Sequence, residues 1–247
     1  LQQGADFIII GEVEVTSQQL INTLQTESTY FESINGIAYL QENKLIKTIS
    51  RPVLTDLDNL PFPAWKFIQM KDYQRAWLQK SGYFSLNMTT TRGCPFKCNW
   101  CAKPIYGNRY NSRSPEKVVE EIDFLISNYQ VEHIWFCDDI FGLKPGWIKR
   151  FSELVVSKNL QFKFKIQCRA DLLLDDENIQ HLANAGCDEI WIGAESGSQK
   201  ILDAMDKGTT VKQIYTATRL MQKHGIKPCL FLQFGYLDEL QTDIDLT

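Results

Sequence analysis

Three of the seven cysteines, Cys94, Cys98 and Cys101, lie close together in the sequence. Thiolates separated by three and then two residues can face one metal centre from a single loop. Zinc sites usually pair their cysteines two residues apart and close with four ligands, and iron–sulfur cubanes normally take four cysteines. Spacing alone therefore leaves three alternatives: an iron–sulfur centre, a zinc site and a chance grouping.

The other four cysteines, at positions 137, 168, 187 and 229, lie singly in or beside apolar segments, where a thiol behaves as a small hydrophobe. An odd cysteine count without a secretion signal argues against a disulfide scaffold. We therefore expect a reducing, cytoplasmic environment.

Composition excludes several classes of protein. The chain has 247 residues, of which 44% are hydrophobic and 23% are charged, as in ordinary globular proteins. No run approaches the ~18 apolar residues of a membrane span. The net charge of -4 gives no surface suited to a phosphate backbone, so we expect no nucleic-acid partner.

The first and last residues of the sequence both read as the middle of a fold, and we expect a piece of a longer protein.

The elements that would position the cysteines follow a regular rhythm from about residue 84 onward. Apolar strand candidates alternate with amphipathic helical segments, which is typical of a parallel sheet with right-handed crossovers. The expected strands are 84–89, 133–137, 162–167, 189–193 and 228–234, and the expected helices are 115–128, 146–157, 176–185 and 211–224. This spacing predicts an α/β fold with a partial (β/α) barrel.

The N-terminal part has a different pattern. It predicts a strand over 6–10, a helix capped by Thr16 or Ser17 and running to about Leu24, and a hairpin over 36–49. The proline-rich segment 51–65 reads as a linker or as a strap over a domain surface.

Polar residues follow the expected strands where a barrel would place its site, at the carboxyl ends. The cysteine cluster follows the first strand, Asp138-Asp139 the second, Arg169-Ala170-Asp171 the third and Glu195-Ser196-Gly197 the fourth. The sequence therefore predicts one site at this edge of the sheet.

The segment 89–101, Thr-Thr-Thr-Arg-Gly-Cys-Pro-Phe-Lys-Cys-Asn-Trp-Cys, closely resembles the signature of radical S-adenosylmethionine (SAM) enzymes. Further motifs follow in register at 135–141, 169–171, 192–199 and 207–210. The ordered set, over about residues 56–240, resembles the subgroup that often carries an N-terminal cobalamin-binding domain. The barrel would be of radical SAM type and truncated at the C-terminus, because a sixth strand is expected after residue 247.

The resemblance implies that Cys94, Cys98 and Cys101 hold a [4Fe-4S] cluster whose fourth iron binds S-adenosyl-L-methionine. One electron would then cleave SAM to methionine and a 5′-deoxyadenosyl radical, which abstracts hydrogen from a substrate. An external reductant such as flavodoxin or ferredoxin and a small-molecule or cofactor-like substrate are the implied partners.

The resemblance also assigns SAM contacts, each beside a structural alternative. Trp100 would pack near the adenine, or belong to an aromatic core. Asp139, favoured over Asp138, would accept from the ammonium, although an Asp after a strand also caps turns. Arg169 would meet the carboxylate or ribose, or simply pair with Asp171. The remaining expected contacts are Glu195 and Ser196 at the ribose and Lys207 at the carboxylate or at a solvated helix end.

The N-terminal piece is similar to the end of a Rossmann-like cobalamin-binding domain. Residues 5–12 match its last strand and turn, although Val13 stands where the family usually has glycine, and 57–65 match its connection to the barrel. The expected organisation is a domain remnant over 1–50, a linker or strap over 51–82 and the incomplete barrel over 83–247. The cobalt-ligating histidine motif belongs upstream of residue 1, so cobalamin is an expectation for the full-length protein.

Two alternatives to this function stay open. One is a non-catalytic zinc or iron–sulfur module serving electron transfer, which a fourth ligand such as Cys137 would favour. The other is a cobalamin-independent radical SAM methylthiotransferase or cyclase.

Overall fold

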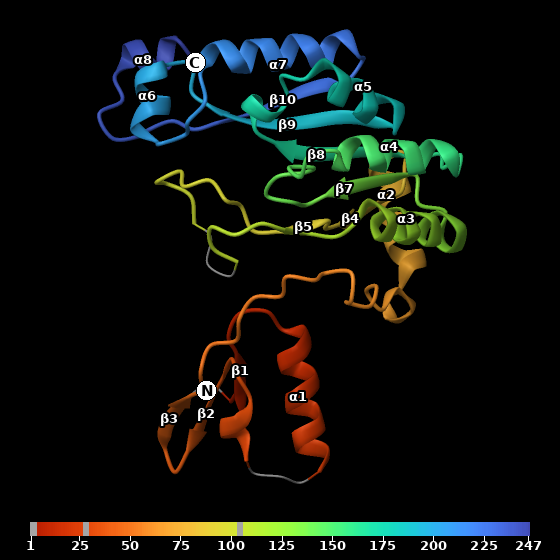
Figure 1. Cartoon of the computed structure of the whole chain (residues 1–247), viewed down its shortest axis with the longest axis vertical. Helices are drawn as coiled ribbons and strands as arrows, with labels where there is room; N and C mark the ends of the chain where they lie inside the picture. The colour runs from red at the N-terminus through yellow and green to blue at the C-terminus, as the bar shows by residue number, and fades with distance from the viewer. Residues whose placement is uncertain (1–3, 27–29, 103–105) are drawn as a thin grey trace. The chain divides into compact units, whose positions relative to one another are not determined.

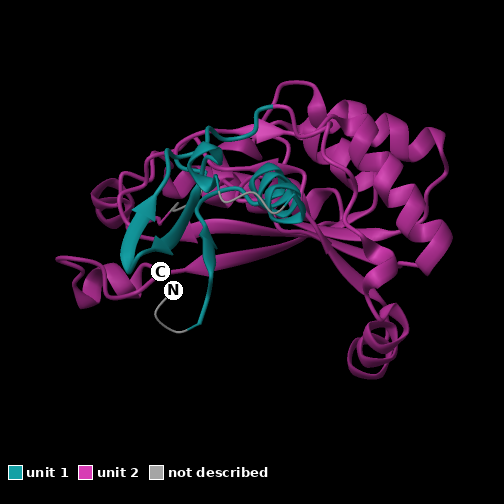
Figure 2. Ribbon diagram, turned by 90° about the horizontal axis from the view of Figure 1, so that it is seen from below, with its two compact units in different colours: residues 1–55, 103–107 teal, residues 56–102, 108–247 magenta. Residues whose placement is uncertain are grey.

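The computed structural model describes residues 4–26, 30–102 and 106–247. The chain forms two compact units, one of residues 1–55 with 103–107 and one of residues 56–102 with 108–247 (Figure 2). Each unit has its own hydrophobic core.

The first unit is a small sheet with one helix. Strands β1 (Phe7–Ile9), β2 (Ile37–Gln41) and β3 (Lys44–Lys47) pair antiparallel in the order β1-β2-β3, as the hairpin pattern predicted for the last two. Helix α1 (Glu14–Gln25) supplies Leu20 to a core that also contains Ile34, Ile37 and Tyr39. A 3₁₀ turn, η1 (Phe31–Ser33), precedes β2.

The predicted start of helix α1 is wrong. The N-cap is Val13, which makes no side-chain cap bond, and Thr16 lies inside the first turn. Thr16 is buried, and its hydroxyl is satisfied there: it donates to the carbonyl of Asn35 at 3.3 Å and accepts from Nε of Arg51 at 2.7 Å. A tertiary contact therefore uses the hydroxyl that the sequence pattern assigned to capping.

The second unit contains a five-stranded parallel sheet. The strands are β4 (Ser85–Met88), β7 (His133–Phe136), β8 (Lys163–Cys168), β9 (Cys187–Glu195) and β10 (Lys227–Leu232), in the order β10-β9-β8-β7-β4 (Figure 1). All neighbouring pairs are parallel. The α/β fold of partial-barrel type is confirmed, with every predicted strand in place.

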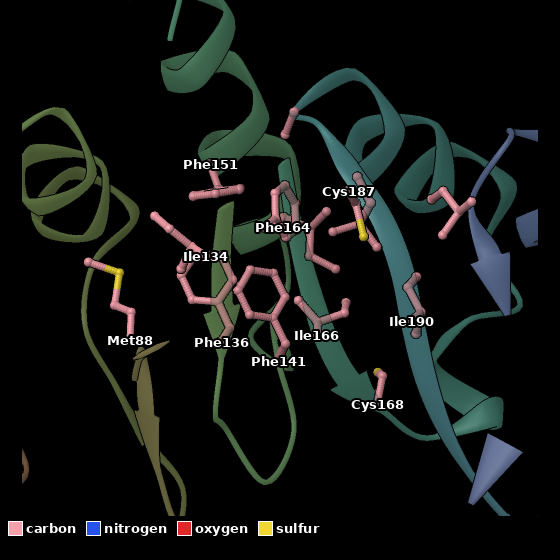
Figure 3. Packing of buried hydrophobic residues seen from close by; sticks show 14 of the residues in the cluster. Met88, Ile134, Phe136, Phe141, Phe151, Phe164, Ile166, Cys168, Cys187 and Ile190 are labelled. Atoms are coloured by element: carbon pink, nitrogen blue, oxygen red, sulfur yellow. The ribbon is translucent and has the colours of Figure 1, made fainter. Parts of the chain in front are cut away.

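Helices cover one face of this sheet (Figure 1). They are α3 (Pro115–Tyr129), α4 (Trp147–Ser157), α5 (Asp176–Asn184) and α7 (Val211–Lys223). The short α6 (Gln199–Ala204) comes between β9 and α7 in the sequence. Ser114 caps α3 through its side chain, and Thr210 forms a capping box with Gln213 on α7. Between helices and sheet lies an aromatic core in which Phe136 and Phe164 pack edge to face (Figure 3).

The segment expected as linker contains ordered structure. A 3₁₀ turn, η2 (Trp65–Phe67), and helix α2 (Met70–Ser81) lie within it. The proline-rich part is bonded to α3: Oδ1 of Asp58 accepts from the backbone N–H of Ser114 at 2.9 Å, and Trp65 donates to Glu121 at 3.2 Å. Residues 58–65 therefore form a strap over α3.

Three further short elements complete the second unit. Strands β5 (Thr91–Arg92) and β6 (Asn111–Ser112) pair antiparallel and flank the cysteine segment in sequence. Helix α8 (Gln241–Asp245) is the last element of the described chain. Across the described ranges, every helix is too short or too polar to cross a membrane.

Candidate active site

The cysteine loop, residues 93–102, runs without helix or strand between β5 and β6. Asn99 ties it to the C-terminal end of α6: its backbone N–H donates to the carbonyl of Met205 at 3.1 Å, and its side-chain amide donates to the carbonyl of Ala204 at 2.7 Å. The hydroxyl of Tyr236 donates to the same amide's oxygen at 2.6 Å. Asn99, which the sequence analysis did not single out, thus fixes the middle of the loop.

The three loop cysteines are thiols, with Cys94 and Cys98 half-buried and Cys101 exposed. Within the ranges that the structure describes, no three His, Cys, Asp or Glu side chains are grouped to hold a single metal ion. A four-iron cubane binds each thiolate at a different iron, so its ligands need not meet at one point. A donor set of three thiols on one loop suits such a cubane better than a closed zinc site.

Cys137, the thiol considered as a fourth ligand, is directed elsewhere. Its sulfur donates to the carbonyl of Trp135 at 3.6 Å, and burial raises its pKa. Burial also raises the pKa of Cys168 to about 12, so this core thiol resists forming the thiolate that binds metal.

Arg169 lies directly after β8 and reaches the cysteine loop. Its Nη1 donates to the sulfur of Cys98 at 3.7 Å, and its guanidinium stacks 3.7 Å from the ring centroid of Phe96. Nε donates to Asp171 at 2.9 Å, which is the ion pair that the sequence analysis gave as the structural alternative. Nη2 donates to the carbonyl of Lys207 at 2.7 Å.

Glu195 and Lys207 form a nearly inaccessible ion pair with Nζ 2.8 Å from Oε1, their side chains being 6% and 7% exposed. Glu195 ends β9 with φ of +63°, a left-handed conformation that costs a non-glycine residue of order 1 kcal/mol and is enriched at functional sites. The Lys207 ammonium also lies 5.8 Å from the ring of Trp100, which is 40% exposed. Lys207 is therefore not at a solvated helix end.

The two aspartates after β7 differ sharply. Asp138 is buried and accepts from the backbone N–H groups of Thr90 at 2.7 Å and Thr91 at 2.9 Å, and from the Thr90 hydroxyl. Burial raises the pKa of Asp138 to about 6, because its effect is larger than that of the hydrogen bonds from Thr90 and Thr91, which lower the pKa. Asp138 thus clamps the turn that leads into the cysteine loop. Asp139, which the sequence analysis favoured, is exposed.

Ser196 is buried beside the end of the chain rather than beside Lys207. Its hydroxyl lies 3.0 Å from the Thr247 hydroxyl and accepts from the backbone N–H of Ser198 at 3.0 Å. Gly197 is required here, because an added β-carbon would lie 2.0 Å from the Leu246 carbonyl oxygen. The structure therefore joins Cys98, Phe96, Arg169, Glu195, Lys207 and Trp100 in one chain of contacts, whereas Asp139 and Ser196 lie outside it.

Comparison with known proteins gives this arrangement a family. Residues 88–246 match the model of the radical SAM superfamily. An uncharacterized methyltransferase, PH0819 of Pyrococcus horikoshii, is 27% identical over 243 residues, which are 98% of this chain and 51% of that protein. The anaerobic magnesium-protoporphyrin IX monomethyl ester cyclase of Synechocystis is 28% identical over 222 residues, or 90% of this chain and 43% of the cyclase.

Solved structures agree on the fold. The cobalamin-dependent radical enzyme OxsB with aqua-cobalamin and SAM bound superposes with a TM-score of 0.79 and 25% identity, covering 97% of this chain and 35% of that one. The methyltransferase TsrM of Kitasatospora setae superposes equally well at 19% identity, over 98% of this chain and 48% of TsrM. The chain spans about half or less of the length of these relatives. With its family model matched from β4 to α8, the chain belongs to the radical SAM superfamily.

Proposed function

We propose that the protein containing this chain is a radical SAM enzyme in which Cys94, Cys98 and Cys101 bind a [4Fe-4S] cluster. The observation that carries this proposal is the loop of three thiols fixed beside the buried Glu195–Lys207 pair. When bound and reduced, the cluster supplies the electron that cleaves SAM to methionine and a 5′-deoxyadenosyl radical for hydrogen abstraction.

The chain's own residues would bind and orient SAM at this edge. Glu195, strained and buried, is the group we assign to the ribose hydroxyls, with Ser196 shaping the turn behind it. Lys207 would meet the SAM carboxylate by exchanging its bond to Glu195 for one to the ligand. Trp100 would cover the adenine. Asp139 is accessible for the ammonium, whereas the oxygens of Asp138 are occupied by Thr90 and Thr91.

For the full-length protein we propose cobalamin as a second cofactor and methyl transfer or cyclisation of a small-molecule substrate as the net reaction. The solved structures of OxsB and TsrM contain bound cobalamin, and a methyltransferase and a cyclase are among the relatives. Residues 1–50 would be the end of the cobalamin-binding domain, 51–82 the connection to the barrel and 83–247 the incomplete barrel. A cytoplasmic flavodoxin or ferredoxin would supply the electron.

The test is an electron paramagnetic resonance (EPR) measurement on the full-length protein after anaerobic reconstitution and reduction. We expect a [4Fe-4S]⁺ signal whose shape changes when SAM is added. The Cys98→Ala variant should lose the signal. A cluster that is indifferent to SAM, or a colourless protein containing zinc, would show that the loop is a structural or electron-transfer module and overturn the proposal.

A further inference from the structure

All three guanidinium nitrogens of Arg169 donate hydrogen bonds within the protein. Arg169 is 5% exposed, and burying a guanidinium is costly unless its charge and N–H groups are satisfied. Asp171 satisfies the charge with a fork of two bonds, Nε to Oδ1 at 2.9 Å and Nη2 to Oδ2 at 3.2 Å. Such bidentate pairs fix the plane of the guanidinium.

The same guanidinium holds two other segments. Nη2 also donates to the Lys207 carbonyl at 2.7 Å, so Arg169 secures the backbone of the residue that pairs with Glu195. Its flat face covers Phe96, two residues before Cys98. One side chain therefore connects the end of β8, the cysteine loop and the connection between α6 and α7.

Nε and Nη2 bond to Asp171 and to the Lys207 carbonyl, and the remaining nitrogen, Nη1, donates to the sulfur of Cys98. The sulfur lies 3.7 Å away, within the range of a hydrogen bond to sulfur. The pair of donors Nε and Nη2, which could otherwise bind a SAM carboxylate with two parallel hydrogen bonds, already binds the carboxylate of Asp171. This use of the donors separates Arg169 from the residues that we assign to SAM.

A hydrogen bond to a ligand sulfur favours the more negative, reduced state of an iron–sulfur cluster, because it stabilises charge on the thiolate. We propose that Arg169 is a positioning residue that fixes Cys98 and, through its Nη1–H bond to that thiolate, raises the reduction potential of the cluster. The inference rests on the proposed function and adds to it the control of electron entry from the external reductant.

The test is an EPR-monitored redox titration of the full-length, reconstituted protein without SAM. Arg169→Gln removes the charged donor, so the midpoint potential should fall. At the potential where half of the wild-type cluster is reduced, the ratio of reduced to oxidised cluster should drop by about tenfold, which corresponds to 59 mV for one electron. Asp171→Asn keeps the donor but removes the carboxylate that offsets its charge, so its midpoint should rise.

Opposite shifts in the two variants would support the proposal, since a purely structural role predicts no such pair of signs. Unchanged potentials in variants with full iron content would overturn it. If Arg169→Gln binds no iron, Asp171→Asn alone decides by the direction of its shift.

SAM affinity, measured by calorimetry, should stay within about twofold in Arg169→Gln, because the donors are already used within the protein. A large loss of affinity at unchanged potential would place Arg169 on SAM instead. Failure of the proposed function is distinct, because the wild-type protein itself would then lack a SAM-sensitive signal.

Discussion

The ammonium of Lys207 lies 2.8 Å from Oε1 of Glu195, although the two residues are twelve positions apart and both side chains are almost inaccessible. Each charge depends on the other, because removing one partner of a buried pair leaves the second uncompensated. SAM, bound between them, would replace one set of charge contacts with another. The pair is therefore both a structural element and the centre of the proposed binding site.

Glu195→Gln should lower the free energy of unfolding by about 3 kcal/mol, because the Lys207 ammonium would stay buried without its counter-charge. SAM affinity should fall by roughly tenfold, because the variant loses a hydrogen bond from the ligand to a charged group. Iron content should stay unchanged. Chemical denaturation, calorimetry and iron analysis measure the three quantities. The control is Glu120→Gln, which breaks the exposed pair of Glu120 with Lys117 and should change none of them. Undiminished SAM affinity in Glu195→Gln would remove Glu195 from the site.

Gly193→Ala tests the same pair by sterics alone. A β-carbon at Gly193 would lie 2.7 Å from Nζ of Lys207 and 2.8 Å from Oε1 of Glu195, so it should displace both groups and lower stability and SAM affinity. A double-mutant cycle with Lys207→Met checks the cause. If the ammonium is the group that clashes, Gly193→Ala should cost clearly less in the Lys207→Met background than in the wild type. Equal costs in both backgrounds would refute this explanation.

Cys98→Ala should abolish cluster binding with little change in stability, because the half-buried thiol lies on a loop. Cys168→Ala is the matched control: its thiol lies in the core and has a pKa raised to about 12 by burial, so this variant should keep its iron and lose some stability. Iron content per chain and thermal unfolding separate the two outcomes. Normal iron content in Cys98→Ala would contradict the assignment of the loop.

Asp138 should make stability depend on pH in a defined direction. Burial raises its pKa from 3.8 to about 6, so the folded state binds its proton more tightly than the unfolded state does. The protonated carboxyl therefore stabilises the fold fully at pH values below 3.8, the pKa in the unfolded chain. This stabilisation is lost as the pH rises through about 6, so the free energy of unfolding falls by about 3 kcal/mol.

The measurement is urea denaturation of the iron-free protein between pH 4 and 7.5, compared with Asp138→Asn. The asparagine oxygen can still accept from Thr90 and Thr91, so the variant should fold and lose the part of the pH dependence that belongs to this group. Identical pH profiles for the wild type and the variant would show that the Asp138 proton is not linked to folding.

The parallel sheet was predictable because its strands are apolar runs separated by amphipathic helices, and the period of the pattern identifies both. Helix α2 was missed because its sequence is rich in Lys, Arg and Gln and buries only Met70, so it lacks a clear apolar stripe. The cysteines and the polar residues after each strand were predictable from topology.

Pairings within the site were not predictable. The sequence favoured Asp139 over Asp138 without showing where either side chain lies, and only the fold turns Asp138 inward to Thr90 and leaves Asp139 exposed. Nothing local brings Asn99 to Ala204 or Arg169 to Cys98, residues that are 105 and 71 positions apart. Such contacts arise when parallel strands bring their following loops to one edge.

Strand β10 forms the edge of the five-stranded sheet, and Leu230, Phe231, Leu232 and Phe234 on or just after it are exposed. Such an edge offers a row of backbone donors and acceptors, flanked by apolar side chains, to any extended segment. At high protein concentration this edge would favour strand-to-strand self-association of the chain. Charged substitutions at Leu230 and Leu232 are therefore the rational choice for preparing homogeneous material.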